Sequence, residues 1–295
     1  MKKIIFLISI LNLVYGQVER PVCGTPPSSQ EEINQISSSV EQWLGTRDND
    51  RNEMKYIFVA WHIVHASNGQ GNYGDDVAYD AVAWLNETFA PHNVVFEVDT
   101  ITRTENDEWF SDWYDQVFQG SQALSIDAFH NMNVYTADLY AAGVAGFAFF
   151  ANSFPAGDYR FSVNVDYRDL AYGNDVLTHE VGHHLNLRHT FSGSCGADGD
   201  GIDDTPRHLD SELWTCNDNL DSCPNDDGND PIHNYMTYTS SSCQYEFTSG
   251  QEDNVHYAIE TYHYGYLENN FGAPNLYVDA LSFEEDTDED GILNP

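Results

Sequence analysis

The sequence predicts an α+β domain over residues 53–270, because runs typical of buried strands alternate with segments of helical spacing. The run at 55–66 (KYIFVAWHIVHA) is rich in β-branched and aromatic residues, as buried strands are. In the segment at 76–89, Val77, Val82, Leu85 and Phe89 recur at helical spacing and can share one face. A chain of 295 residues, 41% of them hydrophobic, is long enough to bury such a core.

Further strands are predicted downstream of these two elements. The apolar runs at 94–101, 131–137 and 161–167 have the composition of strands. The glycine-containing apolar segment at 143–151 suits an edge strand. Residues 109–129 are mixed and acidic, and their pattern predicts no element.

The C-terminal half is predicted to hold two helices separated by a long loop. One helix begins at Asn174 or Asp175 and ends near Leu185. The other covers 248–262, with Thr248 or Ser249 as its N-cap. Between them, 192–231 is rich in Gly, Asp, Asn and Cys without periodicity, so this loop needs crosslinks or bound ions to hold it.

The formal net charge of −37 limits the classes of partner. So strong an acidic balance argues against nucleic acid and against anionic membrane surfaces, and we expect neither as a partner. It favours cationic partners and calcium. A solvated acidic surface with no partner is the alternative.

The N-terminus predicts secretion. Residues 1–16 combine Met-Lys-Lys, the apolar run Ile4–Leu13 and a short end at Val14–Gly16, which is typical of a signal peptide. The apolar run is too short to span a bilayer. Residues 17–52 are polar with one weakly amphipathic stretch, and are interpreted as a pro-segment or linker outside the core. An extracellular location permits disulfides.

The segment HEVGHHLNLRH at 179–189 carries the chemistry. On a helix, His179 and His183 lie about 6 Å apart along one face and can bind one metal ion, while Glu180 can reach a water molecule beside it. Zinc accepts imidazole nitrogen at about 2.0–2.1 Å and keeps one position open at catalytic sites. The pattern predicts a zinc site with Glu180 as general base. A chance HExxH on a buried helix is the alternative.

His189 requires the helix to end. On a continued helix it would lie about 9 Å beyond His183 and about 120° around the axis, out of reach of the same ion. The chain must therefore turn back near Asn186, a residue type that tolerates positive φ. His189 as third ligand and Asn186 as turn residue support each other.

The long HExxHxxxxxH motif followed by Asn-Tyr-Met-Thr-Tyr at 234–238 resembles the metzincin clan of zinc peptidases. The resemblance implies a mixed, mostly parallel sheet with an active-site helix and a backing helix, followed by a loop-rich C-terminal subdomain. It also implies that Met236 packs beneath the metal and that Tyr238 helps to bind the metal or the oxyanion.

The closer resemblance is to the pappalysin family. HEVGHHLNLRHTF, a Cys- and Asp-rich loop with Asp-Asp-Thr-Pro at 203–206, NYMTY and FTSGQ follow one another as in its catalytic core. This implies a secreted zinc endopeptidase that acts on protein or peptide substrates. Asn186 departs from the glycine common there.

Five cysteines occur in the chain. Four of them allow three pairings, and their spacing does not choose. The family resemblance implies Cys195–Cys223 and Cys216–Cys243. The fifth, Cys23, stands in an R-x-x-C-G-T context similar to a cysteine switch of this family, in which the thiolate binds the zinc of a latent form. An unpaired surface thiol, or one paired with another chain, is the alternative.

Two further expectations concern processing and calcium. Arg47, Arg51 and Lys55 are predicted to lie in an exposed stretch where cleavage would release activity. Crowded oxygen ligands suit Ca²⁺, and the candidates for it are Asp198, Asp200, Asp203, Asp204 and Thr205. A solvated acidic loop without an ion is the alternative. The acidic tail at 271–295 contains D-x-D-x-D-G and resembles a truncated calcium-binding repeat.

The rival function is a calcium-dependent adhesion or structural module on an inactive metzincin scaffold. Retention of all three histidines, Glu180 and Tyr238 favours the enzyme.

Overall fold

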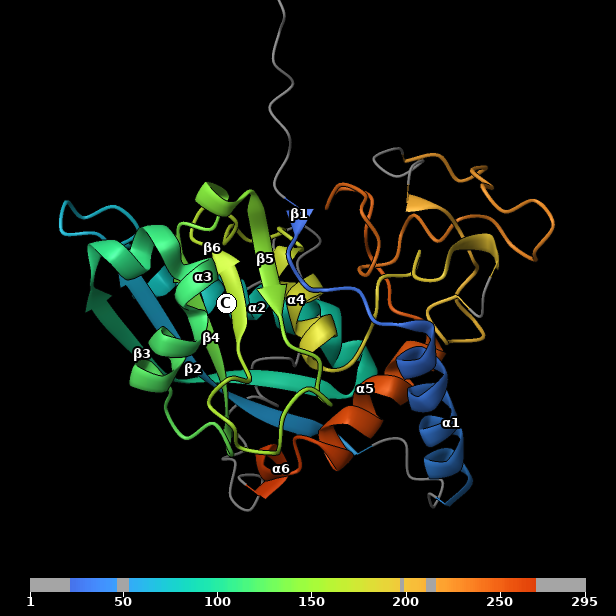
Figure 1. Cartoon of the computed structure of the whole chain (residues 1–295), viewed down its shortest axis with the longest axis horizontal. Coiled ribbons are helices and arrows are strands. Elements are labelled where there is room, and N and C mark those ends of the chain that lie inside the picture. Colours follow the sequence, from blue (N-terminus) through green and yellow to red (C-terminus); the bar gives the residue numbers. More distant parts are fainter. Residues whose placement is uncertain (1–21, 47–52, 197–198, 211–215, 269–295) are drawn as a thin grey trace, which may run out of the picture.

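The computed structural model describes residues 22–46, 53–196, 199–210 and 216–268. Its centre is a six-stranded sheet of order β1-β5-β6-β4-β2-β3 in which only β5 and β6 pair antiparallel (Figure 1). The strands are β1 (Val22–Cys23), β2 (Lys55–His65), β3 (Val94–Glu105), β4 (Asn131–Ala137), β5 (Val144–Ala148) and β6 (Val163–Asp166). The predicted α+β class with a mixed, mostly parallel sheet is confirmed.

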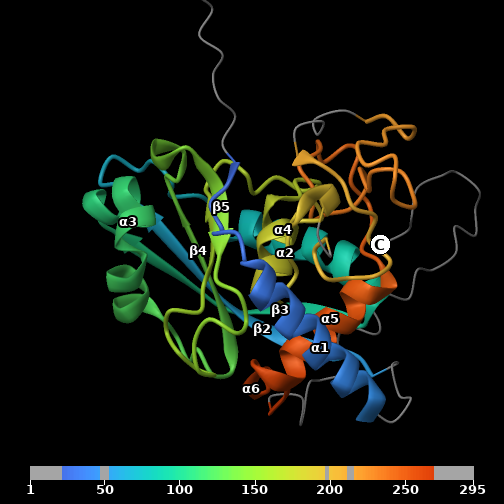
Figure 2. The same cartoon turned by 45° about the vertical axis from the view of Figure 1, so that its right-hand side comes forward.

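Helices cover both faces of the sheet. The helices are α1 (Gln30–Thr46), α2 (Asp75–Phe89), α3 (Asp107–Leu124), α4 (Val176–His184), α5 (Ser249–Thr261) and α6 (Gly265–Glu268). Short 3-10 turns are η1 (Ala90–His92), η2 (Tyr140–Ala142) and η3 (Ser194–Gly196). Figures 1 and 2 show α3 on one face and α2 with α4 on the other.

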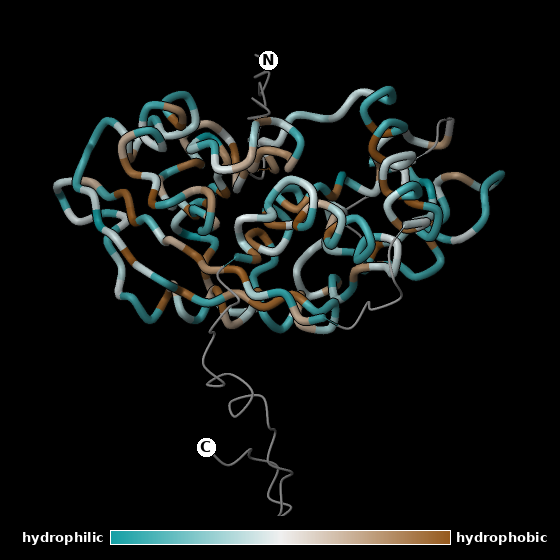
Figure 3. Tube along the Cα trace, turned by 90° about the horizontal axis from the view of Figure 1, so that it is seen from below, coloured by the Kyte–Doolittle hydropathy of each residue, from teal (hydrophilic) through white to brown (hydrophobic). Residues whose placement is uncertain are grey.

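The core forms because β2 is apolar on both faces. Val59 and Trp61 belong to the larger cluster, which includes side chains of α2 and α4. Val64 belongs to a second cluster, with Phe110 and Trp113 of α3. In Figure 3 the hydrophobic residues lie mainly inside and the hydrophilic residues outside. The helix α4 is thus packed against the sheet.

Residues 109–129, which the pattern left unassigned, contain most of α3. The helix begins after Asn106, whose side-chain oxygen accepts a hydrogen bond from Trp109 N at 3.0 Å. Its buried face includes Phe110, Trp113 and Val117. Tyr114 and Phe118 are exposed and put aromatic residues on the outer face too, which hides the amphipathic pattern in the sequence. The strand predicted at 161–167 is shorter in the structure, where β6 covers Val163–Asp166, and the strand predicted at 94–101 is longer, since β3 continues to Glu105.

The region between α4 and α5 is held by crosslinks. The structure joins Cys195 to Cys223 and Cys216 to Cys243, the pairing implied by the family resemblance. Because Cys216 lies between Cys195 and Cys223 in the sequence, the two disulfide loops overlap along the chain. This region lies to the upper right of the sheet in Figure 1.

The helix α1 corrects the view that 17–52 stays outside the core. Its residues Ile33, Ile36 and Val40 are buried, the last two beside Tyr257 of α5. Lys55 was expected in an exposed stretch, which is wrong: its side chain is 3% exposed and its Nζ lies 2.8 Å from a carboxylate of α5.

Several expectations fall on other residues. The signal peptide, Arg47, Arg51 and the acidic tail lie outside the described part of the chain. Among the described helices, none is both long enough and apolar enough to cross a bilayer.

Candidate active site

The helix α4 ends where the zinc motif needs it to end. Leu187 N donates to Gly182 O at 2.8 Å and Asn186 N donates to His183 O at 2.9 Å, which closes the last turn. Asn186 has a φ of 74°, in the left-handed region expected for it. The chain then turns back and brings His189 to the side chains on α4.

Three imidazoles converge on one point. The Nε2 atoms of His179, His183 and His189 lie 3.1 Å from one another. Nδ1 of His179 donates to Tyr235 O at 2.8 Å, and Nδ1 of His183 donates to Leu187 O at 2.7 Å. These bonds place the ring hydrogen on Nδ1, so Nε2 keeps its lone pair for a ligand.

The convergence fits a zinc ion. Nitrogens bound at about 2.0–2.1 Å to a tetrahedral ion lie about 3.3 Å apart, close to the observed spacing. Burial lowers the pKa of His179 to about 4 and those of His183 and His189 well below the usual range. The rings are therefore neutral at physiological pH, which is the form that binds metal.

Glu180 lies beside the histidines and is 1% exposed. A Cβ on Gly146 of β5 would lie 2.7 Å from Glu180 Cγ, so the close approach of helix and strand requires glycine there. Glu180 Oε2 accepts a hydrogen bond from Thr25 Oγ1 at 3.1 Å. Burial raises the pKa of the Glu180 carboxyl to about 8. Sequence reasoning missed Gly146 and Thr25.

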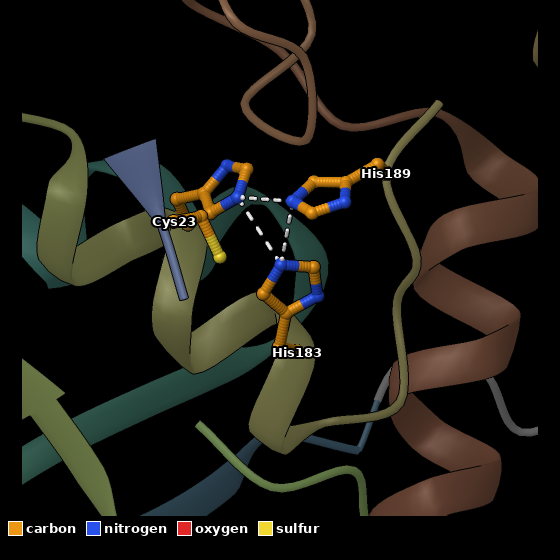
Figure 4. A group of neighbouring side chains, drawn as sticks. Cys23, His183 and His189 are labelled. Carbon is orange, nitrogen blue, oxygen red and sulfur yellow. Dashed lines mark hydrogen bonds between the residues drawn. The ribbon is translucent and has the colours of Figure 1, made fainter. Parts of the chain in front are cut away.

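Cys23 reaches this group from β1, which pairs parallel with β5. Its Sγ lies 3.6 Å from Glu180 Oε2 and within 4.8 Å of the ligand nitrogens of the three histidines. Figure 4 shows the sulfur pointing toward the imidazoles. The Thr25 hydroxyl also accepts a hydrogen bond from Ala148 N at 2.9 Å, which fixes the segment along β5. Burial, and next the Glu180 charge, raise the pKa of the Cys23 thiol.

Met236 packs against the underside of α4. It is fully buried, and a Cβ on Gly182 would lie 2.4 Å from its Sδ. The turn is held by Asn234, which exchanges two side-chain hydrogen bonds with Gln251, of 2.7 and 3.0 Å. Gln251 also completes the capping box of α5 with Thr248. Sequence reasoning missed Gln251, although the FTSGQ segment contains the capping pattern.

Tyr238 stands over the site. Its ring centroid lies 4.9 Å from that of His189 and 4.8 Å from that of Phe191. Burial raises the pKa of its phenol, with the nearby Cys23 and Glu180 charges acting in the same direction. The phenol therefore stays protonated and remains a hydrogen-bond donor.

A pocket of about 290 Å³ opens beside Glu180 and Tyr238. Asp169 and Asp175 are among the described residues that line it, and none of these is a lysine or arginine. Asp175 Oδ1 accepts a hydrogen bond from Trp84 Nε1 at 2.9 Å, and the Ser241 hydroxyl also lies beside this buried carboxyl. Burial raises the pKa of Asp175 to about 7. The sequence showed Asp175 only as a helix cap.

The calcium candidates are less concentrated. Asp198 lies outside the described residues, and the described part of the loop does not bring three acidic ligands together. Asp204 instead accepts hydrogen bonds from Thr248 Oγ1 and Gly250 N at the start of α5. Asp200 Oδ2 and Thr205 Oγ1 are buried close to each other, and Arg188 lies near the Asp200 carboxyl.

Comparisons with known proteins agree with this geometry. The profile described as pregnancy-associated plasma protein-A, the peptidase family of the pappalysins, matches residues 118–260. An extracellular metalloprotease of Verticillium alfalfae is 33% identical over 256 residues, covering 81% of this chain and 89% of that protein. Extracellular metalloprotease 1 of Coccidioides posadasii is 32% identical over 266 residues, covering 83% and 93%.

Solved structures share the fold. A promirolysin mutant of Tannerella forsythia is 23% identical and superposes with a TM-score of 0.69 over 86% of this chain and 100% of that one. Mature mirolysin in complex with a cleaved peptide gives a TM-score of 0.63 over 76% and 100%, also at 23% identity. The chain belongs to the pappalysin family of extracellular metalloproteases.

Proposed function

We propose that this metalloprotease is a zinc endopeptidase in which His179, His183 and His189 hold the metal and Glu180 is the general base. The observation that carries the proposal is the convergence of three Nε2 atoms 3.1 Å apart beside a buried carboxyl group. When bound, zinc polarises the scissile carbonyl and lowers the pKa of a water molecule and, by its charge, of Glu180.

The side chains of the protein then carry the proton and stabilise charge. Glu180 accepts the proton of the attacking water and passes it to the leaving amine. Tyr238 is neutral and donates to the oxyanion that develops on the scissile carbonyl. Gly146 supports this arrangement, because only glycine leaves room for Glu180 next to β5.

Residues 17–52 are proposed to act as a pro-segment with Cys23 as the latency residue. Its sulfur lies within 4.8 Å of the ligand nitrogens and 3.6 Å from Glu180. With zinc present, the Cys23 thiol would lose its proton to the influence of the metal, and its sulfur would then compete with water for the ion. β1 also covers the site physically.

Calcium is proposed to support the loop after the histidines. Asp200 and Thr205 bury neighbouring side-chain oxygens, and oxygens that lie together in this way can bind a cation.

The proposed function is tested by casein hydrolysis by the activated protein. We expect hydrolysis that a zinc chelator abolishes and added zinc restores, with protein or peptide as the substrate class. Chelator-resistant hydrolysis would exclude the zinc mechanism. A folded, zinc-loaded protein without peptidase activity would favour the adhesion module instead.

A further inference from the structure

The helix α1 is attached to the catalytic domain by a complete interface of its own. Ile33, Ile36 and Val40 are spaced by three and four residues, about one helical turn each, and form a single buried stripe. Ile36 and Val40 pack with Tyr257 of α5, and Trp43 packs edge-on against the same ring with 5.9 Å between centroids. This is the arrangement by which an amphipathic helix binds a groove.

Polar contacts fix the position of α1 along the groove. Ser37 Oγ donates to Gly201 O at 2.7 Å. A Cβ on Gly201 would lie 2.7 Å from Ile33 Cγ2, so the loop after the zinc ligands is shaped to the helix. The site therefore specifies both the helix and its register.

Glu260 of α5 separately binds both sides of the 47–52 connection. Its Oε2 accepts a hydrogen bond from Trp43 Nε1 at 3.1 Å, and its Oε1 pairs with Lys55 Nζ at 2.8 Å. Trp43 belongs to α1, and Lys55 is the first residue of β2. Cutting the chain between them would break neither contact.

We infer that the groove formed by α5 and the loop at Gly201 is a binding site for α1 that keeps residues 22–46 attached after cleavage at 47–52. The inference rests on the proposed latency and changes its activation step. One cut in the expected region leaves Cys23 at the metal site. A second cut in the exposed residues between Thr25 and α1 detaches the strand that carries Cys23, while α1 stays bound.

The test uses the full secreted chain with residues 47–52 replaced by a recognition sequence for a site-specific protease. After cleavage, the protein at about 1 µM is passed through gel filtration. We expect the N-terminal fragment to co-elute with the catalytic domain and the protein to stay latent. Elution of the fragment apart from the domain would overturn the inference.

Matched variants of α1 test whether its buried stripe is what retains the fragment. Ile36→Asp places a charge on the buried stripe, whereas Gln35→Asp places the same charge on the adjacent exposed position. After cleavage we expect the first variant to lose its fragment and the second to retain it. Equal retention in both would contradict the inference. Val40→Asp repeats the test should the uncut Ile36→Asp protein show a lowered helix content.

Cys23→Ala gives the third arm. After cleavage at the engineered 47–52 site we expect this variant to retain its fragment, since α1 supplies the attachment. Release from Cys23→Ala would assign the attachment to the metal–thiol bond and overturn the inference. Retention of the fragment is measured without substrate. A protein without peptidase activity would therefore refute the proposed function, but the retention result could still be interpreted.

The same recognition sequence inserted between Pro27 and Ser28 tests the second cut. We expect cleavage there to raise activity at least tenfold while α1 remains bound. Unchanged latency after this cut, or activation by cleavage at 47–52 alone, would refute the two-cut order.

Discussion

Glu180 shows how neighbouring small residues set the position of one functional group. Gly146 leaves room for the Glu180 side chain. Thr25 and Cys23 of the N-terminal segment donate hydrogen bonds to its carboxylate. The oxygen of the proposed general base is thus hydrogen-bonded to the N-terminal segment. The proposed latency would therefore act on the base as well as on the metal ligands.

Replacing Glu180 should separate metal binding from chemistry. We expect Glu180→Ala to fold, to bind about one zinc per chain and to lose activity by a factor of about 10²–10⁴, the usual contribution of a positioned proton carrier. Metal analysis and a peptide assay on activated protein measure both properties. A variant that retains a tenth of wild-type activity would falsify the role of general base.

Asp175 predicts how the pocket beside the site selects side chains. Asp175 lines this pocket, and a lysine or arginine side chain of a substrate that reached its carboxyl would form an ion pair with it. We expect Asp175→Asn to lower kcat/KM by about 10–100-fold for peptides with a basic residue next to the scissile bond, since a hydrogen bond to a charged group contributes about 1.5–3 kcal/mol.

The control for Asp175→Asn is the same peptide with norleucine in place of the basic residue, for which kcat/KM should change less than threefold. Equal losses for both peptides would show that the substitution disturbs α4 and that Asp175 does not bind the basic side chain of the substrate.

At the scale of elements, the strands and α4 were readable from the sequence because composition and spacing act locally. The run at 55–66 became β2, and Asn186 ended α4 as its residue type allows. The placement of α1 was not readable, because its apolar stripe is weak by itself and is buried against residues such as Tyr257, more than 200 positions away in the chain. The pocket carboxyls likewise depend on tertiary placement.

The element β1 predicts a kinetic signature of latency. Cys23→Ala removes the sulfur beside the histidines but leaves the pairing of β1 with β5. We expect the full chain of this variant to begin hydrolysis at once or to process itself quickly, whereas the wild type shows a lag. Progress curves with a quenched peptide measure the lag. An equal lag in both would mean that β1 blocks the site sterically, and the thiol switch would be dropped.

The molecule as a whole combines a densely packed sheet domain with a loop region that has little core of its own. Two disulfides whose loops overlap along the chain crosslink that region. The helices α1 and α5 lie against one of its sides (Figure 2). In this region the buried Asp200 carboxyl has the Thr205 hydroxyl and Arg188 nearby, and a bound cation would add to the positive charge that balances it.

Calcium removal should therefore act on global stability. With zinc kept saturated, we expect a calcium-selective chelator to lower Tm by about 4 °C or more, because ligands that bind only the native state stabilise it by mass action. Differential scanning calorimetry measures the shift, and magnesium added back serves as the control for ionic strength. An unchanged Tm would leave only a solvated acidic loop.

The pairing of β1 with β5 also indicates what kind of polypeptide the mature enzyme can accept. Once β1 leaves, β5 becomes the border of the sheet and presents unpaired N–H and C=O groups. Any extended segment can pair with such a border through its own main chain, whatever its side chains. A helix or an interior strand has no main-chain groups to offer. Loose termini and mobile loops would therefore be cut first, and compact proteins would survive until they unfold locally.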